Sequence, residues 1–353
     1  MEERKTIYLC LAHMSEAGLE QKYVKEAFDT NWVVPLGPNV NGFEEDLKTF
    51  VSKNADGSET SHEVVALSAG TAAVHLALGK GDEVCVQSFT FCASSHPVTY
   101  LGAIPVFIDS EPNSWNMDPE LLEKAILDRK TKTGKYPKAI VPVALYGMPY
   151  DCDKIMAIAD KYGISVIEDV AEGCGSRWKG QVLGTFGKFG VLSFNGNKMI
   201  TTSGGGALIC RDAESKNNIM WYATQARDAY PMSNICAGIG RGQMTVLNDH
   251  VEHHKHVQAL YKELLKDVKG VTLHEAPNGN YDSNYWLSTI TLDENLKIQG
   301  QENVYKKVIK TAVGGAAGVI HMVDNPTTDC QPNKNVEALR VFMLTNGIEI
   351  RPV

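Results

Sequence analysis

The sequence predicts an α/β protein in which a large domain, with a mostly parallel mixed sheet, is followed by a smaller C-terminal α+β domain. Short apolar runs alternate with segments of helical periodicity, which is typical of a parallel sheet with crossover helices. At 353 residues the chain is too long for one small core. A late run over residues 285–292 alternates polar and apolar side chains, as a strand of a smaller domain does. We expect the large domain at 1–214 and the small domain at 215–353.

Six short apolar runs are the predicted strands of the large domain. Between them, apolar residues recur at helical spacing over 119–127 and 153–162. In the second domain, two long helical patterns between about residues 237 and 268 lead into the alternating run at 285–292. The strands are expected at 64–67, 83–86, 105–108, 139–143, 165–167 and 190–194.

Composition excludes several classes of protein. The chain has 34 Lys+Arg against 42 Asp+Glu, a formal net charge of -8, which disfavours a nucleic-acid surface. No apolar run is long enough to span a bilayer or to act as a signal peptide, so we expect a cytoplasmic protein without a membrane partner. The eight cysteines are scattered, with no C-x-x-C pair and no paired histidine cluster. Neither a metal site nor a disulfide framework is therefore expected.

Lys198 is the main candidate for a reactive group. It ends the segment 193–198, which begins at the end of the predicted strand at 190–194 and precedes the glycine run 204–206. An amine for a Schiff base, with a carboxylate on an earlier strand for the pyridinium nitrogen, is what a pyridoxal phosphate enzyme requires. We therefore expect Lys198 to bind this cofactor and then to move a proton as general base and acid. The alternative is an ordinary solvent-exposed lysine.

Asp169 is the candidate partner for the pyridinium nitrogen. It ends an apolar strand, where burying an unpaired carboxylate is costly, so it requires a cationic partner or hydrogen-bond donors. Its neighbour Glu168 is the competing candidate, or else a solvated or ion-paired structural acid. We place Glu172 near the face of the cofactor ring or its hydroxyl group.

Three further positions predict contacts with the same cofactor. Gly70 and Thr71 follow a strand and open an apolar helix, whose free amides and dipole suit a phosphate group; a simple helix cap by Ser68 or Thr71 is the alternative. Phe91 follows the next strand and is expected to stack on the pyridine ring, with a buried core position as the alternative. Ser193 is a further candidate phosphate ligand.

Five segments resemble the DegT/DnrJ/EryC1/StrS sugar aminotransferases, and the resemblance runs nearly end to end. It is closest to the bacillosamine-type branch. Having lysine at 198 argues against a related branch of dehydratases that carries histidine there. The segments are Thr30-Asn31-Trp32-Val33-Val34-Pro35-Leu36-Gly37-Pro38, Ala69-Gly70-Thr71-Ala72, Gln87-Ser88-Phe89-Thr90-Phe91, Glu168-Asp169-Val170-Ala171-Glu172 and Ser193-Phe194-Asn195-Gly196-Asn197-Lys198.

The resemblance implies a fold-type I pyridoxal phosphate enzyme that works as a homodimer, with pyridoxamine phosphate as the intermediate form of its cofactor. Such enzymes transfer the amino group of L-glutamate to C4 of a UDP-4-keto-6-deoxy-N-acetylhexosamine, for surface glycan or polysaccharide biosynthesis. By similarity, Lys198 is the Schiff-base lysine and Asp169 the pyridinium partner. The resemblance also implies phosphate or substrate contacts for Gly70, Thr71 and Ser193. The residues expected along the nucleotide-sugar are Asn31, Trp32, Val33 and Val34.

The chain also departs from the family pattern. The turn at 79–82 is short, the run 225–234 lacks a Gly-Tyr-Asn-Tyr-Arg loop, and Ala144 stands where many relatives have histidine. Because the family motif around 349–353 normally continues, we expect the small domain to be incomplete at its end. A non-catalytic relative acting as a partner subunit is therefore the alternative function. A nicotinamide enzyme is less favoured, since the glycines at 314–318 do not match G-x-G-x-x-G.

Overall fold

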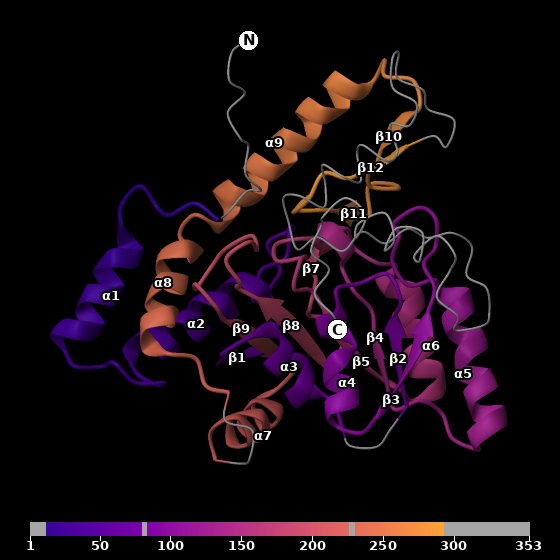
Figure 1. Ribbon diagram of the computed structural model, residues 1–353. Helices are drawn as coiled ribbons and strands as arrows, with labels where there is room; N and C mark the ends of the chain where they lie inside the picture. Colours follow the sequence, from indigo (N-terminus) through magenta and orange to yellow (C-terminus); the bar gives the residue numbers. More distant parts are fainter. Residues whose placement is uncertain (1–11, 80–82, 226–229, 293–353) are drawn as a thin grey trace, which may run out of the picture. The chain divides into compact units, whose positions relative to one another are not determined.

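A seven-stranded mixed sheet lies at the centre of the part of the chain that the computed structural model describes, residues 12–79, 83–225 and 230–292. In space the strand order is β1-β9-β8-β5-β4-β2-β3, and only β9 runs antiparallel to its neighbours. The predicted mostly parallel, mixed sheet is thus confirmed (Figure 1). In chain order the strands are β1 (Glu63–Leu67), β2 (Glu83–Gln87), β3 (Ile104–Ile108), β4 (Ala139–Val141), β5 (Ser165–Asp169), β8 (Phe189–Ser193) and β9 (Gly206–Cys210).

All six predicted strands are present, with small shifts of their ends, but the prediction missed β9. Its first residue, Gly206, belongs to the glycine run that the sequence led us to interpret as a loop. In the structure Gly206 pairs with Leu67 of β1 and with Ser193 of β8. The missing side chain of Gly206 instead leaves room for Ala69 and Gly70 at the start of α3.

Helices cover both faces of the sheet, because each strand sends alternate side chains into a separate core. Within β9, Ala207 belongs to one hydrophobic cluster and Leu208 to the other. The first cluster includes side chains from α2 (Pro38–Ser52), α5 (Pro119–Thr133) and α6 (Cys152–Tyr162). The second includes side chains from α3 (Gly70–Ala77), α4 (His96–Tyr100) and α7 (Ala213–Thr224).

The helices predicted at 119–127 and 153–162 correspond to α5 and α6. Each has an aspartate cap at its start: Asp118 accepts hydrogen bonds from two first-turn amides of α5, and Asp151 accepts one from α6. Each ends at a glycine in the left-handed conformation, Gly134 or Gly163. No helix in the described residues combines the length and the apolarity that a bilayer crossing requires.

The remaining elements include the two helices predicted between 237 and 268. They are α8 (Asn234–Met244) and α9 (Leu247–Leu265). Helix α1 (Leu19–Asp29) packs against α8, and α8 also contacts α2. The short elements are η1 (Cys92–Ser94), η2 (Leu145–Gly147), β6 (Arg177–Trp178), β7 (Gln181–Val182), β10 (Val271–Leu273), β11 (Tyr281–Asp282) and β12 (Ile290–Leu292).

The strand predicted over 285–292 is largely wrong. Only Ile290–Leu292 is a strand, paired antiparallel with β10. Tyr285 has a left-handed φ of 47°, and the Asn284 side chain donates to the backbone carbonyls of Glu172 and Cys174. These side-chain contacts, which alternation cannot reveal, hold the segment as an irregular loop against the sheet domain.

The predicted domain boundary between 214 and 215 falls inside α7. That helix packs against β1, β9 and α3, and the described residues between 12 and 292 belong to one compact unit. Residues 293–353, the C-terminal part of the predicted small domain, lie outside the described residues. The division at 214 and 215 therefore stays a prediction.

Gly206→Ala is expected to destabilise the protein at the edge where β9 meets α3. A Cβ at Gly206 would lie 2.4 Å from the Ala69 carbonyl carbon and 2.4 Å from the Gly70 nitrogen. Such overpacking against backbone costs about 1–3 kcal/mol, so thermal denaturation should show a lower melting temperature. Gly204→Ala is the matched control, because a Cβ at Gly204 meets nothing within 4 Å. Equal melting temperatures for the two variants would contradict this packing.

Candidate active site

Glu168 and Asp169 end β5, and successive strand residues point to opposite faces of a sheet. Glu168 is fully buried and accepts hydrogen bonds from three backbone amides of the turn 184–187. Asp169 instead bonds to Ser94 and lies within the electrostatic influence of Lys198. The structure therefore separates the two competing acids: Glu168 holds a turn, and Asp169 faces the reactive amine.

A chain of hydroxyl groups holds the Asp169 carboxylate. Ser94 Oγ donates to Asp169 Oδ2 over 2.6 Å, and it lies 2.7 Å from Thr90 Oγ1. The Ala171 amide donates to Oδ1 over 3.1 Å. Burial raises the pKa of Asp169, while Ser94, Ala171 and the Lys198 ammonium oppose that rise. One donor on each oxygen leaves lone pairs for a further donor, such as a protonated pyridine nitrogen.

The Lys198 amine lies between a carboxylate and an aromatic ring. Its Nζ is 3.4 Å from Glu172 Oε1 and 4.2 Å from the centroid of the Trp286 ring. The other Glu172 oxygen accepts the Tyr146 amide over 2.7 Å. Burial raises the pKa of Glu172, and the Lys198 ammonium is the main group that lowers it. The Lys198 side chain is only 12% exposed, so the alternative of a solvent-exposed lysine is wrong.

The start of α3 is an uncapped turn of small residues. Its N-cap residue is Ala69 and no side chain caps it, so the alternative cap by Ser68 or Thr71 is not formed. Ser193 lies against this turn: a Cβ built on Gly70 would be 3.0 Å from Ser193 Cβ and 3.3 Å from its Oγ. Because a helix N-terminus attracts anions, we propose Gly70, Thr71 and Ser193 as phosphate contacts.

Phe91 precedes η1, the turn that carries Ser94. Its side chain is 49% exposed, so the alternative of a buried core position is wrong. The predicted stacking of Phe91 on the pyridine ring stays a proposal.

The predicted substrate segment Asn31–Val34 follows α1 and packs beside α8. The carbonyls of Trp32 and Val34 accept hydrogen bonds from Asn234 at the start of α8. The structure does not bring this segment into the cavity that contains Lys198. Its role along the nucleotide-sugar therefore stays a proposal.

Two departures from the family pattern can be located. Ala144 is fully buried, and its amide donates to the carbonyl of Asp169 over 3.0 Å, so its contribution is through the backbone. After α7 the chain returns to the end of β1, where the Ser68 amide donates to the Tyr230 carbonyl. Residues 80–82 and 226–229, within the two shortened loops, lie outside the described residues, as does the end of the chain.

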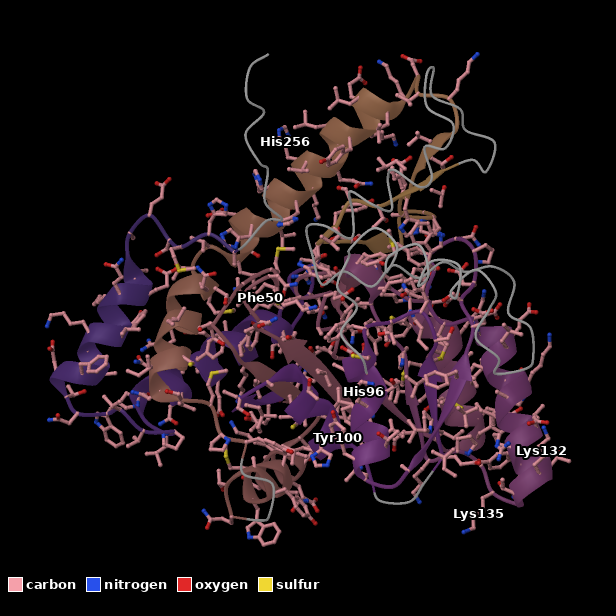
Figure 2. All side chains as sticks on the ribbon, viewed as in Figure 1. Phe50, His96, Tyr100, Lys132, Lys135 and His256 are labelled. Carbon is pink, nitrogen blue, oxygen red and sulfur yellow. The ribbon has the colours of Figure 1, made fainter. Side chains whose placement is uncertain are left out.

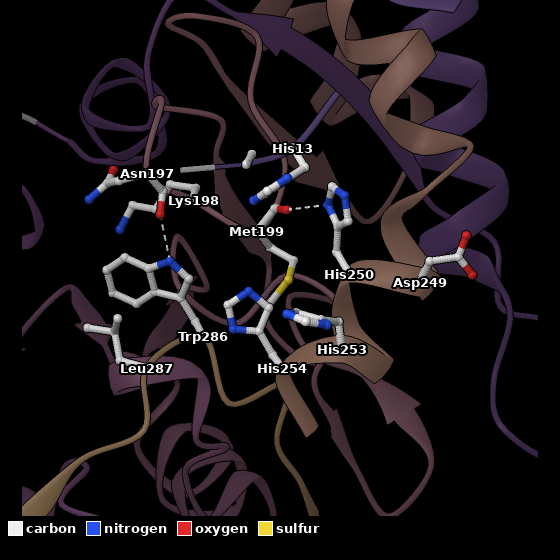
Figure 3. Close-up of a pocket in the computed structure, with 11 residues that line it drawn as sticks. His13, Asn197, Lys198, Met199, Asp249, His250, His253, His254, Trp286 and Leu287 are labelled. Atoms are coloured by element: carbon white, nitrogen blue, oxygen red, sulfur yellow. Dashed lines mark hydrogen bonds between the residues drawn. The ribbon is translucent and has the colours of Figure 1, made fainter. Parts of the chain in front are cut away.

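Lys198 opens onto a cavity of about 360 Å³, shown in Figure 3. Most of its lining was not predicted from the sequence, including three histidines of α9 and Trp286. The spacing of His250, His253 and His254 was a usable signal, since residues three and four apart share a helix face. Among the described residues, no group of His, Cys, Asp and Glu side chains could hold a metal ion. Its lining residues are Ala12, His13, Asn197, Lys198, Met199, Asp249, His250, His253, His254, Trp286 and Leu287.

Ser94→Ala is expected to weaken catalysis without changing the fold. The variant loses the hydroxyl that donates to Asp169, a hydrogen bond to a charged group worth about 1.5–3 kcal/mol. We expect kcat to fall by about tenfold or more, with the visible absorbance of the bound cofactor retained but its pH dependence displaced. Ser95→Ala is the control, because Ser95 Oγ bonds only to a local carbonyl. Unchanged kcat in Ser94→Ala would show that the hydroxyl does not position the carboxylate.

Together these groups fit pyridoxal phosphate. Asp169 is a buried carboxylate with free lone pairs and would bind the ring nitrogen. Lys198 is a largely buried amine and would form the Schiff base. The Gly70 turn, which has no room for a side chain beside Ser193, would serve the phosphate. The charge and hydrogen-bonding capacity of each group match one part of the cofactor.

Comparison with known proteins agrees with this site. The sequence profile of the DegT/DnrJ/EryC1/StrS aminotransferase family matches residues 15–336. EpsN of Bacillus subtilis (strain 168), which is named as a pyridoxal phosphate-dependent aminotransferase, is 45% identical over 309 residues, covering 83% of this chain and 76% of EpsN. A GDP-perosamine synthase of Caulobacter vibrioides is 35% identical over 298 residues, covering 79% of this chain and 76% of that protein.

Solved structures show the same fold. A DegT DnrJ EryC1 StrS aminotransferase from Brucella abortus has a TM-score of 0.71 at 28% identity, covering 79% of this chain and 76% of that one. PseC of Helicobacter pylori, an aminotransferase, has a TM-score of 0.74 at 20% identity, covering 88% of this chain and 82% of that one, and so supports the fold alone. The chain therefore belongs to the DegT/DnrJ/EryC1/StrS aminotransferase family of pyridoxal phosphate-dependent enzymes that act on nucleotide sugars.

Proposed function

We propose that this chain is a cytoplasmic enzyme that moves the amino group of L-glutamate to C4 of a UDP-4-keto-6-deoxy-N-acetylhexosamine, for a surface glycan or polysaccharide. The observation that carries the proposal is the position of Lys198. Its amine is paired with Glu172 on one side and lines a cavity on the other. A keto sugar entering that cavity would meet an amine already set for proton transfer.

The chain's residues divide the chemical work. Pyridoxal phosphate, when bound, supplies an electron sink that stabilises negative charge at the substrate carbon. Asp169 would keep the ring nitrogen protonated, and the Thr90–Ser94 hydroxyls would keep Asp169 oriented. Lys198 Nζ would take the proton from Cα of glutamate and later return a proton to C4 of the sugar. Glu172, 3.4 Å away, would hold the amine in position between these transfers.

The test is product analysis. The enzyme would be incubated with L-glutamate and UDP-4-keto-6-deoxy-N-acetylglucosamine, and the product examined by NMR for a proton on an amine-bearing C4. A GDP-linked 4-keto-6-deoxy sugar is run in parallel, because three similar proteins are named GDP-perosamine synthases. Amination of the GDP-sugar alone would reject the UDP assignment and leave the cofactor assignment unchanged.

We also propose a homodimer, as the family resemblance implies. The segment after α1 exposes a run of apolar side chains, which in a monomer would remain in water. Trp32 is 39%, Val33 50% and Leu36 57% exposed. A second copy covering this segment would remove that apolar surface from water.

Leu36→Asp is expected to shift the protein toward the monomer. A carboxylate in the apolar segment would have to be desolvated in the interface, which opposes association. Molecular mass measured over a range of concentrations by light scattering should show earlier dissociation than in the wild type. Leu264→Asp is the control, because Leu264 is 71% exposed on α9, outside the segment. A dimer as stable in Leu36→Asp as in the control would exclude this segment as the interface.

A further inference from the structure

The cavity beside Lys198 contains two histidines whose ring tautomers are fixed by the backbone. His250 Nδ1 lies 3.0 Å from the carbonyl oxygen of Met199, and His254 Nδ1 lies 3.2 Å from that of Tyr285. A carbonyl oxygen can only accept, so in each ring Nδ1 carries the hydrogen. In the neutral ring, Nε2 then carries the lone pair.

These lone pairs are available to a ligand. Among the described residues, neither Nε2 atom has a hydrogen-bond partner. Burial lowers the pKa of His254, which favours its neutral ring. With Nδ1 of each ring bonded to a backbone carbonyl, the α9 wall of the cavity presents Nε2 of His250 and His254 to a ligand. Such a wall suits hydroxyl donors better than phosphate or carboxylate groups.

The other walls suit a sugar ring. Met199, Trp286 and Leu287 provide apolar surface, and Trp286 is fixed by its Nε1, which donates to the Asn197 carbonyl over 2.7 Å. The volume of about 360 Å³ is at the small end of ligand pockets. It is suited to one pyranose ring and leaves the nucleotide part to bind elsewhere.

We propose that His250 and His254 are specificity-determining residues that accept hydrogen bonds from hydroxyl groups of the keto-sugar ring, while Lys198 transfers the proton to C4 of that ring. This inference rests on the proposed function and deepens it. It separates sugar-ring recognition, assigned to α9 and Trp286, from recognition of the amino donor. The two half-reactions should therefore respond differently when these acceptors are removed.

The experiment uses the holoenzyme variants His250→Asn and His254→Asn. Asparagine can keep a side-chain N–H near the position of Nδ1 and has no acceptor at the position of Nε2. His256→Asn is the matched control, because His256 lies on the same helix and does not line the cavity (Figure 2). For each protein, the conversion by L-glutamate alone is followed by absorbance. KM and calorimetric affinity are measured for UDP-4-keto-6-deoxy-N-acetylglucosamine, and folding is checked by melting temperature.

We expect KM for the sugar to rise about tenfold in each cavity variant, the equivalent of one lost hydrogen bond, while the glutamate half-reaction and the control stay at wild-type values. Sugar affinity unchanged in both variants would overturn the inference and leave the proposed function standing. A weakened glutamate half-reaction with normal sugar affinity would overturn it by assigning the histidines to the amino donor. Wild-type enzyme that reacts with glutamate but binds no keto sugar would instead reject the proposed function, and with it this inference.

Discussion

Lys198→Ala is expected to lose at least about 10⁴-fold in transamination rate, because no other described side chain offers an amine at this position between Glu172 and the cavity. The wild-type holoenzyme should absorb in the visible range, with the band moving toward the ultraviolet when L-glutamate is added. The variant should lack both features. A spectrophotometric titration with cofactor and then glutamate measures the effect.

Lys198→Arg separates chemistry from stability. Removing the ammonium leaves the Glu172 carboxylate buried without its cation, which costs on the order of 3 kcal/mol. Arginine keeps that charge but is not a usable nucleophile or base. We therefore expect both variants to be inactive, and only Lys198→Ala to have a markedly lower melting temperature. Lys188→Ala is the control: Lys188 is exposed, so this variant should behave as wild type. Activity in Lys198→Arg would show that another group performs the proton transfer, and a wild-type protein without the visible band would favour the non-catalytic alternative.

Asp169→Asn is the second change with a large expected effect, and it acts in opposite directions on activity and stability. Losing the charge that keeps the pyridine nitrogen protonated should lower kcat by about 10²- to 10³-fold, the range for a removed electrostatic group. The cofactor-free variant should be more stable at pH 7, by on the order of 1 kcal/mol, because a buried carboxylate no longer has to be ionised.

The pH dependence gives the sign of that second effect. Burial raises the pKa of Asp169 above its usual 3.8, so between the two values the folded protein holds a proton that the unfolded chain has lost. The free energy of unfolding therefore falls as pH rises through this window. The variant should show a shallower fall, because Asp169 no longer contributes, while Glu168, Glu172, Glu44 and Asp46, whose pKa values burial also raises, still do. Chemical denaturation from pH 4 upward tests this, with Asp160→Asn as an exposed control. If the free energy of unfolding changed equally with pH in wild type and Asp169→Asn, Asp169 would not be an acid whose pKa is raised by burial.

The sequence alone was sufficient for six of the seven sheet strands, because parallel strands buried on both faces are short apolar runs. It also led to the prediction of Lys198 and Asp169 as site residues, and the structure brings these two within electrostatic reach of each other. It failed at β9 and at 285–292. In the first case small residues concealed a strand between two neighbours, and in the second an alternating pattern concealed a loop held by the Asn284 side chain.

From the sequence came the predicted chemistry of this protein: an amine, an acid and a helix start made of small residues. Each follows a strand, and a strand's apolar pattern is local, so it can be recognised from the sequence. Only the tertiary structure decided which acid faces the amine, that Ser94 holds it, and that Trp286 and the α9 histidines line the cavity beside it. These last relations join residues dozens of positions apart. They depend on strand alternation, side-chain direction and helix packing, and the spacing of residues along the chain does not encode them.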